Sequence, residues 1–215
     1  MTHYRDIESL RADHQRIGAD IRARLAQFNA VPREEWFMEL AYCLLTPQSS
    51  ARSAAMAISA LRNAGYPGTG HDSIPDPAPL LKGNGYYIRF HHTKARRLLE
   101  AAARREEIVR AVAAARGSDG RDLRVWMVGQ VKGLGWKEAS HFLRNIGFRD
   151  LAILDRHILR NLRRHGVIRS VPAALTLKRY LVIERAFLRF ARAIDIPMDE
   201  LDLLFWSRET GEILK

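Results

Sequence analysis

Apolar residues recur at the spacing of an α-helix along almost the whole chain, and this pattern limits the possible folds more than any other feature. Ile7, Leu10, Ile21 and Leu25, for example, lie on one face of a first helix. No segment has the strict alternation of apolar and polar residues that is typical of a half-buried strand. The sequence therefore predicts an all-α fold with roughly ten helices.

Proline and glycine mark where the predicted helices begin and end. Pro32 suits the first position of a helix, Pro47 interrupts that helix, and Gly65 suits the cap of the next one. The many prolines and glycines from Tyr66 to Gly85 predict an irregular connection. The expected helices cover residues 7–28, 32–46, 51–64, 90–116 with a break near 104, 122 to the glycine turn at 133–135, that turn to 147, 155–165, 175–194 and 198–208.

The chain is strongly basic, with 35 Lys and Arg against 24 Asp and Glu and a formal charge of +11 over 215 residues. The basic residues are spread along the whole length, which favours a folded basic surface that binds a polyanion such as nucleic acid. The N-terminus is charged and lacks the apolar core of a signal peptide, and no apolar run is long enough to span a bilayer. We therefore expect an intracellular protein of the cytoplasm or nucleoid, with no membrane partner.

A single cysteine, Cys43, lies in an apolar run and suits the protein core. One thiol cannot supply a four-cysteine iron-sulfur or zinc site, and the histidines lack the HExxH spacing of a catalytic zinc helix. We expect no metal and no other cofactor.

The segment VKGLGWKEASHFLRNIGFRDLAILDR, residues 131–156, places a glycine turn between two predicted helices. Two helices joined by such a turn form a helix-hairpin-helix, which binds one DNA strand through backbone amides without reading its sequence. The turn is expected to contact phosphate through Lys132, Gly133 and Gly135, because its amides and the following helix N-terminus suit an anion.

Lys137 lies in the first turn of the second hairpin helix, where a cation opposes the helix dipole, and Asp155 follows eighteen residues later. A lysine amine can attack a sugar C1′ and form a Schiff base if the site favours the neutral amine. Partial burial, the helix N-terminus and the nearby Lys132 would all favour it. A carboxylate can stabilise the positive charge that develops on the sugar. Solvation of Lys137 and helix capping by Asp155 are the structural alternatives.

These residues resemble the catalytic motif of the helix-hairpin-helix GPD superfamily of DNA glycosylases. KEASHFLRNIG followed by AILDRHILR is most similar to the second type of 8-oxoguanine DNA glycosylase/lyase, and the resemblance covers nearly the whole chain. It implies that Lys137 is the Schiff-base nucleophile and Asp155 its catalytic partner. The expected activity is base excision repair: removal of 8-oxoguanine from DNA, followed by cleavage 3′ of the abasic site through β-elimination.

The resemblance also implies four residues that recognise the extruded base. LLTPQS is similar to a family segment whose glutamine approaches the extruded nucleotide, which suggests Gln48. IRFHHTKA suggests Phe90 as one stacking aromatic residue, and FWSRETGEILK suggests Trp206 as the other, with the carboxylate of Lys215 reading the lesion. Without the resemblance, the favoured interpretation of Phe90 and Trp206 would be that both are aromatic residues of the protein core.

The resemblance implies two helical lobes with the DNA cleft between them: residues 32–147, which contain the helix-hairpin-helix, and residues 1–31 plus 148–215. The implied partner is double-stranded DNA that contains 8-oxoguanine, bound by a monomer. Two alternatives remain. One is the same chemistry on oxidised pyrimidines, as in endonuclease III, although this chain lacks the four cysteines of that branch. The other is a non-catalytic helix-hairpin-helix DNA-binding module.

Overall fold

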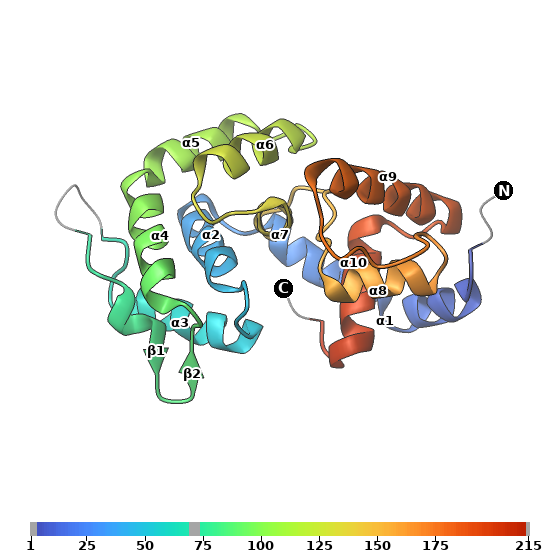
Figure 1. Ribbon diagram of the computed structural model, residues 1–215, viewed down its shortest axis with the longest axis horizontal. Coiled ribbons are helices and arrows are strands. Elements are labelled where there is room, and N and C mark those ends of the chain that lie inside the picture. Colours follow the sequence, from blue (N-terminus) through green and yellow to red (C-terminus); the bar gives the residue numbers. More distant parts are fainter. Residues whose placement is uncertain (1–3, 69–73, 214–215) are drawn as a thin grey trace. The chain divides into compact units, whose positions relative to one another are not determined.

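The computed structural model describes residues 4–68 and 74–213 (Figure 1). These residues form ten α-helices, two 3-10 helices and one short β-hairpin, so the predicted all-α fold is confirmed. No helix within them is long and apolar enough to cross a membrane. The α-helices are α1 (Ile7–Asn29), α2 (Trp36–Leu45), α3 (Ala51–Asn63), α4 (His91–Ala103), α5 (Arg105–Ala114), α6 (Arg121–Gln130), α7 (Trp136–Asn145), α8 (Arg156–Arg164), α9 (Leu177–Ile194) and α10 (Met198–Thr210).

The predicted start of the second helix at Pro32 was wrong, because α2 begins at Trp36. Pro32 has extended backbone angles, with φ −70° and ψ 156°, and it is followed by the 3-10 helix η1 (Arg33–Glu35). The Glu35 N–H donates to the Pro32 carbonyl at 3.0 Å, an i to i+3 bond that tightens the chain before the α-helix begins.

The segment after Tyr66, expected to be irregular, contains the 3-10 helix η2 (Ala78–Leu81) and a two-stranded hairpin. Strand β1 (Lys82–Gly83) pairs with β2 (Tyr86–Tyr87) in antiparallel register, and Gly85 supplies the positive φ of the connecting turn. Strands of two residues are too short to show an alternating pattern, so the sequence could not reveal them.

Two compact units make up the chain. The central unit holds the described residues of Pro32–Phe142, and the discontinuous unit holds those of Met1–Val31 and Leu143–Lys215. The division falls inside α7, whereas the sequence analysis placed it after Gly147.

Helix α2 forms the core of the central unit. All ten of its residues are buried, and it packs against α3, α4 and α5. Figure 1 shows α4 leading from the β-hairpin to α5, and α6 packs against α5 in turn. The glycine turn and α7 follow α6 directly, so the helix-hairpin-helix is attached to this core through α5 and α6.

Helix α10 has the same role in the discontinuous unit, where it packs against α1, α8 and α9 (Figure 1). Every residue from Met198 to Phe205 is buried, although three of them are acidic. A buried carboxylate needs hydrogen-bond or ionic partners, and each of the three finds one on a different segment of the unit. The pairs are Glu200 with His14 of α1 (2.6 Å), Asp202 with Arg144 of α7 (3.2 Å) and Asp199 with the backbone N–H of Asp150 (3.1 Å).

Burial raises the pKa of Asp199 to about 6, although the Asp150 N–H and the nearby Arg149 and Arg144 favour its ionised form. A carboxyl with a raised pKa in the folded state binds its proton more tightly there than in the unfolded chain. Stability is therefore lost as pH rises from the ordinary value of 3.8 through 6, by at most about 3 kcal/mol.

We expect the Asp199→Asn variant to lack this loss, because the amide oxygen can still accept the Asp150 N–H and does not ionise. The melting temperature of the variant minus that of the wild type should rise as pH increases from about 4 to about 7 and then stay constant. Thermal melts across this range measure the difference. Asp195→Asn, at an exposed position, serves as the control and should show no such trend. A pH-independent difference for Asp199→Asn would contradict the assignment.

Candidate active site

The turn between α6 and α7 favours glycine at position 133 because of its backbone conformation, and the flexible Arg97 side chain lies against it. Gly133 has φ +87°, a conformation that side chains rarely adopt, and a Cβ placed there would lie 2.4 Å from Cδ of Arg97. The Leu134 N–H donates to the Val131 carbonyl at 3.1 Å and closes the turn, while the Leu134 side chain is buried beneath it. The Arg97 side chain from α4 therefore covers one side of the turn.

The other two predicted phosphate contacts, Lys132 and Gly135, lie in the turn before the N-terminus of α7. Lys132 is exposed, and its Nζ lies 3.3 Å from Oε1 of Glu100. Gly135 immediately precedes α7, whose first backbone bond runs from the Ala139 N–H to the Gly135 carbonyl at 2.9 Å. The amides before Ala139 have no partner within the helix, and the helix dipole favours an anion near them. This arrangement suits a phosphate oxygen, and the contact itself stays a prediction.

Lys137 occupies the second position of α7, with its side chain 27% exposed. Its Nζ lies 3.6 Å from Oε1 of Glu138, whose Oε2 would lie 2.9 Å from a Cβ placed at Gly135. Lys132 pairs with Glu100, and the charged group in contact with Lys137 is a carboxylate, so the role of Lys132 as a neighbouring cation stays a prediction.

Asp155 caps α8, as its alternative interpretation predicted. Its Oδ1 accepts the N–H groups of His157 and Ile158, both at 2.8 Å. Within the described residues its Oδ2 has no hydrogen-bond partner. One carboxylate oxygen is therefore committed to the helix, and the other is available for chemistry.

The chain that leads into Asp155 is held rigidly. Residues 151–154 are buried, and the Ala152 N–H donates to Oε2 of Glu184 at 2.9 Å. The hydroxyl of Tyr180 donates to the Ala152 carbonyl. Both side chains come from α9, so this helix fixes the approach to Asp155.

Trp206 is connected to Asp155 through His157. The centres of the Trp206 and His157 rings lie 5.0 Å apart. The backbone N–H of His157 is one of the two N–H groups that donate to the Asp155 carboxylate. Nδ1 of His157 lies 3.4 Å from Oε2 of Glu209, which holds the ring in place beside Trp206. Trp206 is partly exposed, and Lys215 lies outside the described residues.

Gln48 and Phe90 line one open pocket of about 850 Å³ in the central unit. Both have left-handed backbone conformations, with φ +56° and +60°. Phe90 is 51% exposed, so the core interpretation of this residue was wrong. The Arg89 guanidinium lies 4.9 Å from the centre of the Phe90 ring. Backbone strain at non-glycine residues is typical of functional sites.

Lys94 of α4 lies within the IRFHHTKA segment, and the motif resemblance predicted no role for it. The residue is 2% exposed, and its Nζ donates to the carbonyls of Leu45 (2.7 Å) and Pro47 (2.6 Å). Burial, with the nearby Arg97 charge, lowers the pKa of Lys94 to about 8, although Glu138 raises it. The sequence did contain a signal for this buried role. Lys94 lies among the apolar residues Ala95 and Leu98 of α4, and a lysine on a buried face needs a hydrogen-bond partner inside the protein.

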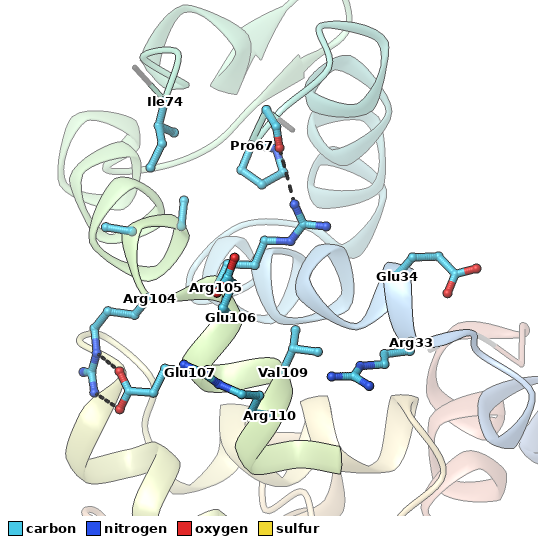
Figure 2. Close-up of a pocket in the computed structure, with 13 residues that line it drawn as sticks. Arg33, Glu34, Pro67, Ile74, Arg104, Arg105, Glu106, Glu107, Val109 and Arg110 are labelled. Carbon is cyan, nitrogen blue, oxygen red and sulfur yellow. Dashed lines mark hydrogen bonds and ion pairs between the residues drawn. The ribbon is translucent and has the colours of Figure 1, made fainter. Parts of the chain in front are cut away.

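A second pocket in the central unit, of about 1030 Å³, contains none of the predicted site residues (Figure 2). Several of its charges already have partners in the protein: Arg104 bonds to Glu107 at 2.8 Å, and Arg105 donates to the Gly68 carbonyl at 3.4 Å. Its chemistry gives no role in the predicted reaction. No group of three or more His, Cys, Asp or Glu side chains in residues 4–68 and 74–213 is arranged to hold a metal ion.

The predicted residues thus form two groups, one in each unit. The central unit holds Gln48 and Phe90 in one pocket, and it also holds Lys137 with the glycine turn. The discontinuous unit holds Asp155 and Trp206, which are joined through His157.

Comparison with known proteins gives a consistent result. Residues 21–196 match the family described as 8-oxoguanine DNA glycosylase. Two relatives, both named 8-oxoguanine DNA glycosylase/AP lyase, come from Fusobacterium nucleatum (35% identical, covering 99% of this chain and 98% of the relative) and Korarchaeum cryptofilum (36% identical, 96% and 95%). A crystal structure of the Methanocaldococcus jannaschii 8-oxoguanine glycosylase/lyase with a 15mer DNA that contains 8-oxoguanine superimposes with a TM-score of 0.83 at 30% identity, covering 97% of this chain and 99% of that one.

Three observations indicate the same family. The family model matches most of the chain, the relatives are covered almost completely, and the helix-hairpin-helix carries Lys137 in its second helix. The chain belongs to the 8-oxoguanine DNA glycosylase family.

Proposed function

We propose that this protein excises 8-oxoguanine from double-stranded DNA and then cleaves the strand at the resulting abasic site, with Lys137 as the nucleophile. The observation that carries the proposal is the position of Lys137. Its partly exposed amine follows a glycine turn suited to a DNA phosphate, in a chain of this family. The enzyme is proposed to act as a monomer on DNA inside the cell.

In the first step the neutral amine of Lys137 attacks C1′ of the damaged nucleotide. The glycosidic bond breaks, and the base leaves with its bonding electrons and takes up a proton. Ring opening of the sugar gives an imine between Lys137 and C1′. Loss of a C2′ proton then expels the 3′ phosphate, and water finally releases the lysine.

Asp155 is proposed to stabilise the positive charge that develops on the sugar as the base departs. Its Oδ1 holds the N-terminus of α8, which leaves Oδ2 for this task and for subsequent proton transfers. The cap and the rigid segment before it position the carboxylate in advance, so little reorganisation is needed during the reaction.

Glu138 introduces a requirement that the sequence did not suggest. Its carboxylate lies 3.6 Å from the Lys137 amine, so this ion pair must separate and the amine must lose a proton before attack. An arriving DNA phosphate brings negative charge to the same turn and would repel Glu138, which helps to separate the pair.

Recognition of the base is proposed to involve Gln48, Phe90, Trp206 and Lys215. An exposed Phe90 and a partly exposed Trp206 can each present a ring face to an extruded base. 8-Oxoguanine differs from guanine by a C8 carbonyl and a hydrogen on N7. An acceptor aimed at N7-H would therefore bind the lesion and repel guanine.

Replacing Lys137 tests the nucleophile. Borohydride should trap a covalent complex between the wild-type protein and a duplex that contains 8-oxoguanine, and Lys137→Gln should abolish it because an amide cannot form the imine. Lys178→Gln, at an exposed position on α9, should trap as well as the wild type. Trapping that survives in Lys137→Gln would refute the assignment. A wild type that binds but never traps or nicks would favour the non-catalytic module, and a panel of damaged duplexes distinguishes oxidised pyrimidines.

Asp155→Asn tests the carboxylate apart from the cap. Asparagine is an equally good N-cap residue, so α8 should persist and affinity for the damaged duplex should stay within about threefold of the wild type. Single-turnover base release should fall by about 100-fold, because a neutral amide stabilises developing positive charge poorly. Equal losses in binding and base release would indicate that Asp155 acts only as a structural cap.

The salt dependence of binding tests the phosphate contacts. If about four phosphates are neutralised, raising salt from about 50 to about 200 mM should weaken binding by roughly 150-fold. Lys132→Gln should reduce the slope of log affinity against log salt by about one charge. Fluorescence anisotropy with a labelled duplex measures both values. An unchanged slope would remove Lys132 from the phosphate contacts, and a flat wild-type curve would contradict DNA binding through phosphates.

A further inference from the structure

The Lys94 ammonium is buried, and within residues 4–68 and 74–213 it has no anionic hydrogen-bond partner. It is 2% exposed and donates to two backbone carbonyls and to Oγ of Ser49 (3.2 Å). Burying a charge is costly, and neutral partners repay the cost less fully than a carboxylate does. A methionine or leucine would fill the same volume on the apolar face of α4 without that cost. The hydrogen bonds of Lys94 therefore need an explanation beyond packing.

The Lys94 ammonium binds the segment that carries Gln48. Its partners Leu45, Pro47 and Ser49 span the connection from the end of α2 to the N-cap of α3. The last carbonyls of a helix lack partners within it and attract a cation. Gln48 lies inside this connection with φ +56°, a conformation that is unfavourable for a non-glycine residue and that the surrounding contacts must hold.

Lys94 also lies in the first turn after Phe90, where its backbone makes the helix bond that any non-proline residue would make at this position, and the side-chain link to this segment runs through Ser49. The backbone N–H of Lys94 donates to the Phe90 carbonyl at 3.0 Å in the first turn of α4. Oγ of Ser49 accepts a second bond, from the N–H of Arg89 at 3.0 Å. Lys94 and Ser49 thus tie the segment of Gln48 to the segment of Phe90, on either side of the pocket that both residues line.

We propose that Lys94 is a positioning residue for lesion recognition: its buried ammonium sets Gln48 relative to Phe90 and so shapes the pocket that receives the extruded base. The inference rests on the proposed role of these two residues in base recognition. Lys94 is inaccessible to DNA and acts through the backbone and Ser49. The proposal assigns Lys94 no part in the lysine chemistry at Lys137.

The test compares two reactions of the same variants. Lys94→Met keeps the length and volume of the side chain and removes its three hydrogen bonds. Single-turnover excision of 8-oxoguanine should fall by at least about tenfold, while borohydride trapping on a preformed abasic site, which has no base to recognise, should change by less than about threefold. Lys178→Met should behave as the wild type in both reactions.

Ser49→Ala gives a milder variant if Lys94→Met folds poorly. It removes the hydroxyl that joins the two segments and should show the same selective loss of excision, to a smaller extent. Thermal melts monitor folding of each variant. Parallel loss of excision and trapping, or no loss of either, would overturn the proposal.

A double-mutant cycle with Gln48→Ala separates positioning from other effects. If Lys94 acts by placing Gln48, the double variant should lose little more excision than the worse single variant. Multiplicative losses would show that Lys94 does not act through Gln48. A wild-type protein that traps abasic sites but does not excise 8-oxoguanine would instead refute the proposed function, and the two failures are therefore distinguishable.

Discussion

The discontinuous unit depends on three carboxylates buried along α10. Removing one partner of a buried ion pair such as Asp202 with Arg144 typically costs about 3 to 5 kcal/mol, because the remaining charge is left buried and unpaired. One carboxylate holds α1, another holds the end of α7, and Asp199 holds the backbone at Asp150, where the chain turns toward Asp155. Helix α10 also carries Trp206. The position of the candidate catalytic carboxylate therefore depends on α10, which holds Asp150, as well as on α9, which holds Ala152.

The central unit uses two lysines in opposite ways, and their exposure decides which chemistry each can perform. Lys94 is almost fully buried, and its ammonium donates hydrogen bonds to backbone carbonyls of a neighbouring loop. Lys137 keeps about a quarter of its side chain exposed and has an acidic neighbour instead of backbone acceptors. A nucleophile must reach its substrate and lose its charge. A positioning group must stay charged and out of reach.

The sequence was sufficient for features that depend on local patterns. Helical spacing and capping residues predicted the helical order and the cap at Asp155, and motif resemblance predicted the family. The sequence patterns did not predict the 3-10 helix after Pro32 or the β-hairpin, because each of these structures is only a few residues long. The sequence also could not show the exposure of Phe90, the free Oδ2 of Asp155 or the contacts of Lys94. Each of these depends on segments distant in the chain, which no local pattern records.

The division of the chain has a consequence for the order of folding. The central unit is continuous, so its core can form as soon as its own residues are available. The discontinuous unit joins α1 to α8, α9 and α10, and its core helix is the last of them. Contacts between such distant segments form slowly, because the intervening chain must first be closed into a loop. During synthesis the glycine turn and Lys137 would therefore reach native structure before Asp155 and the helices that pack around it.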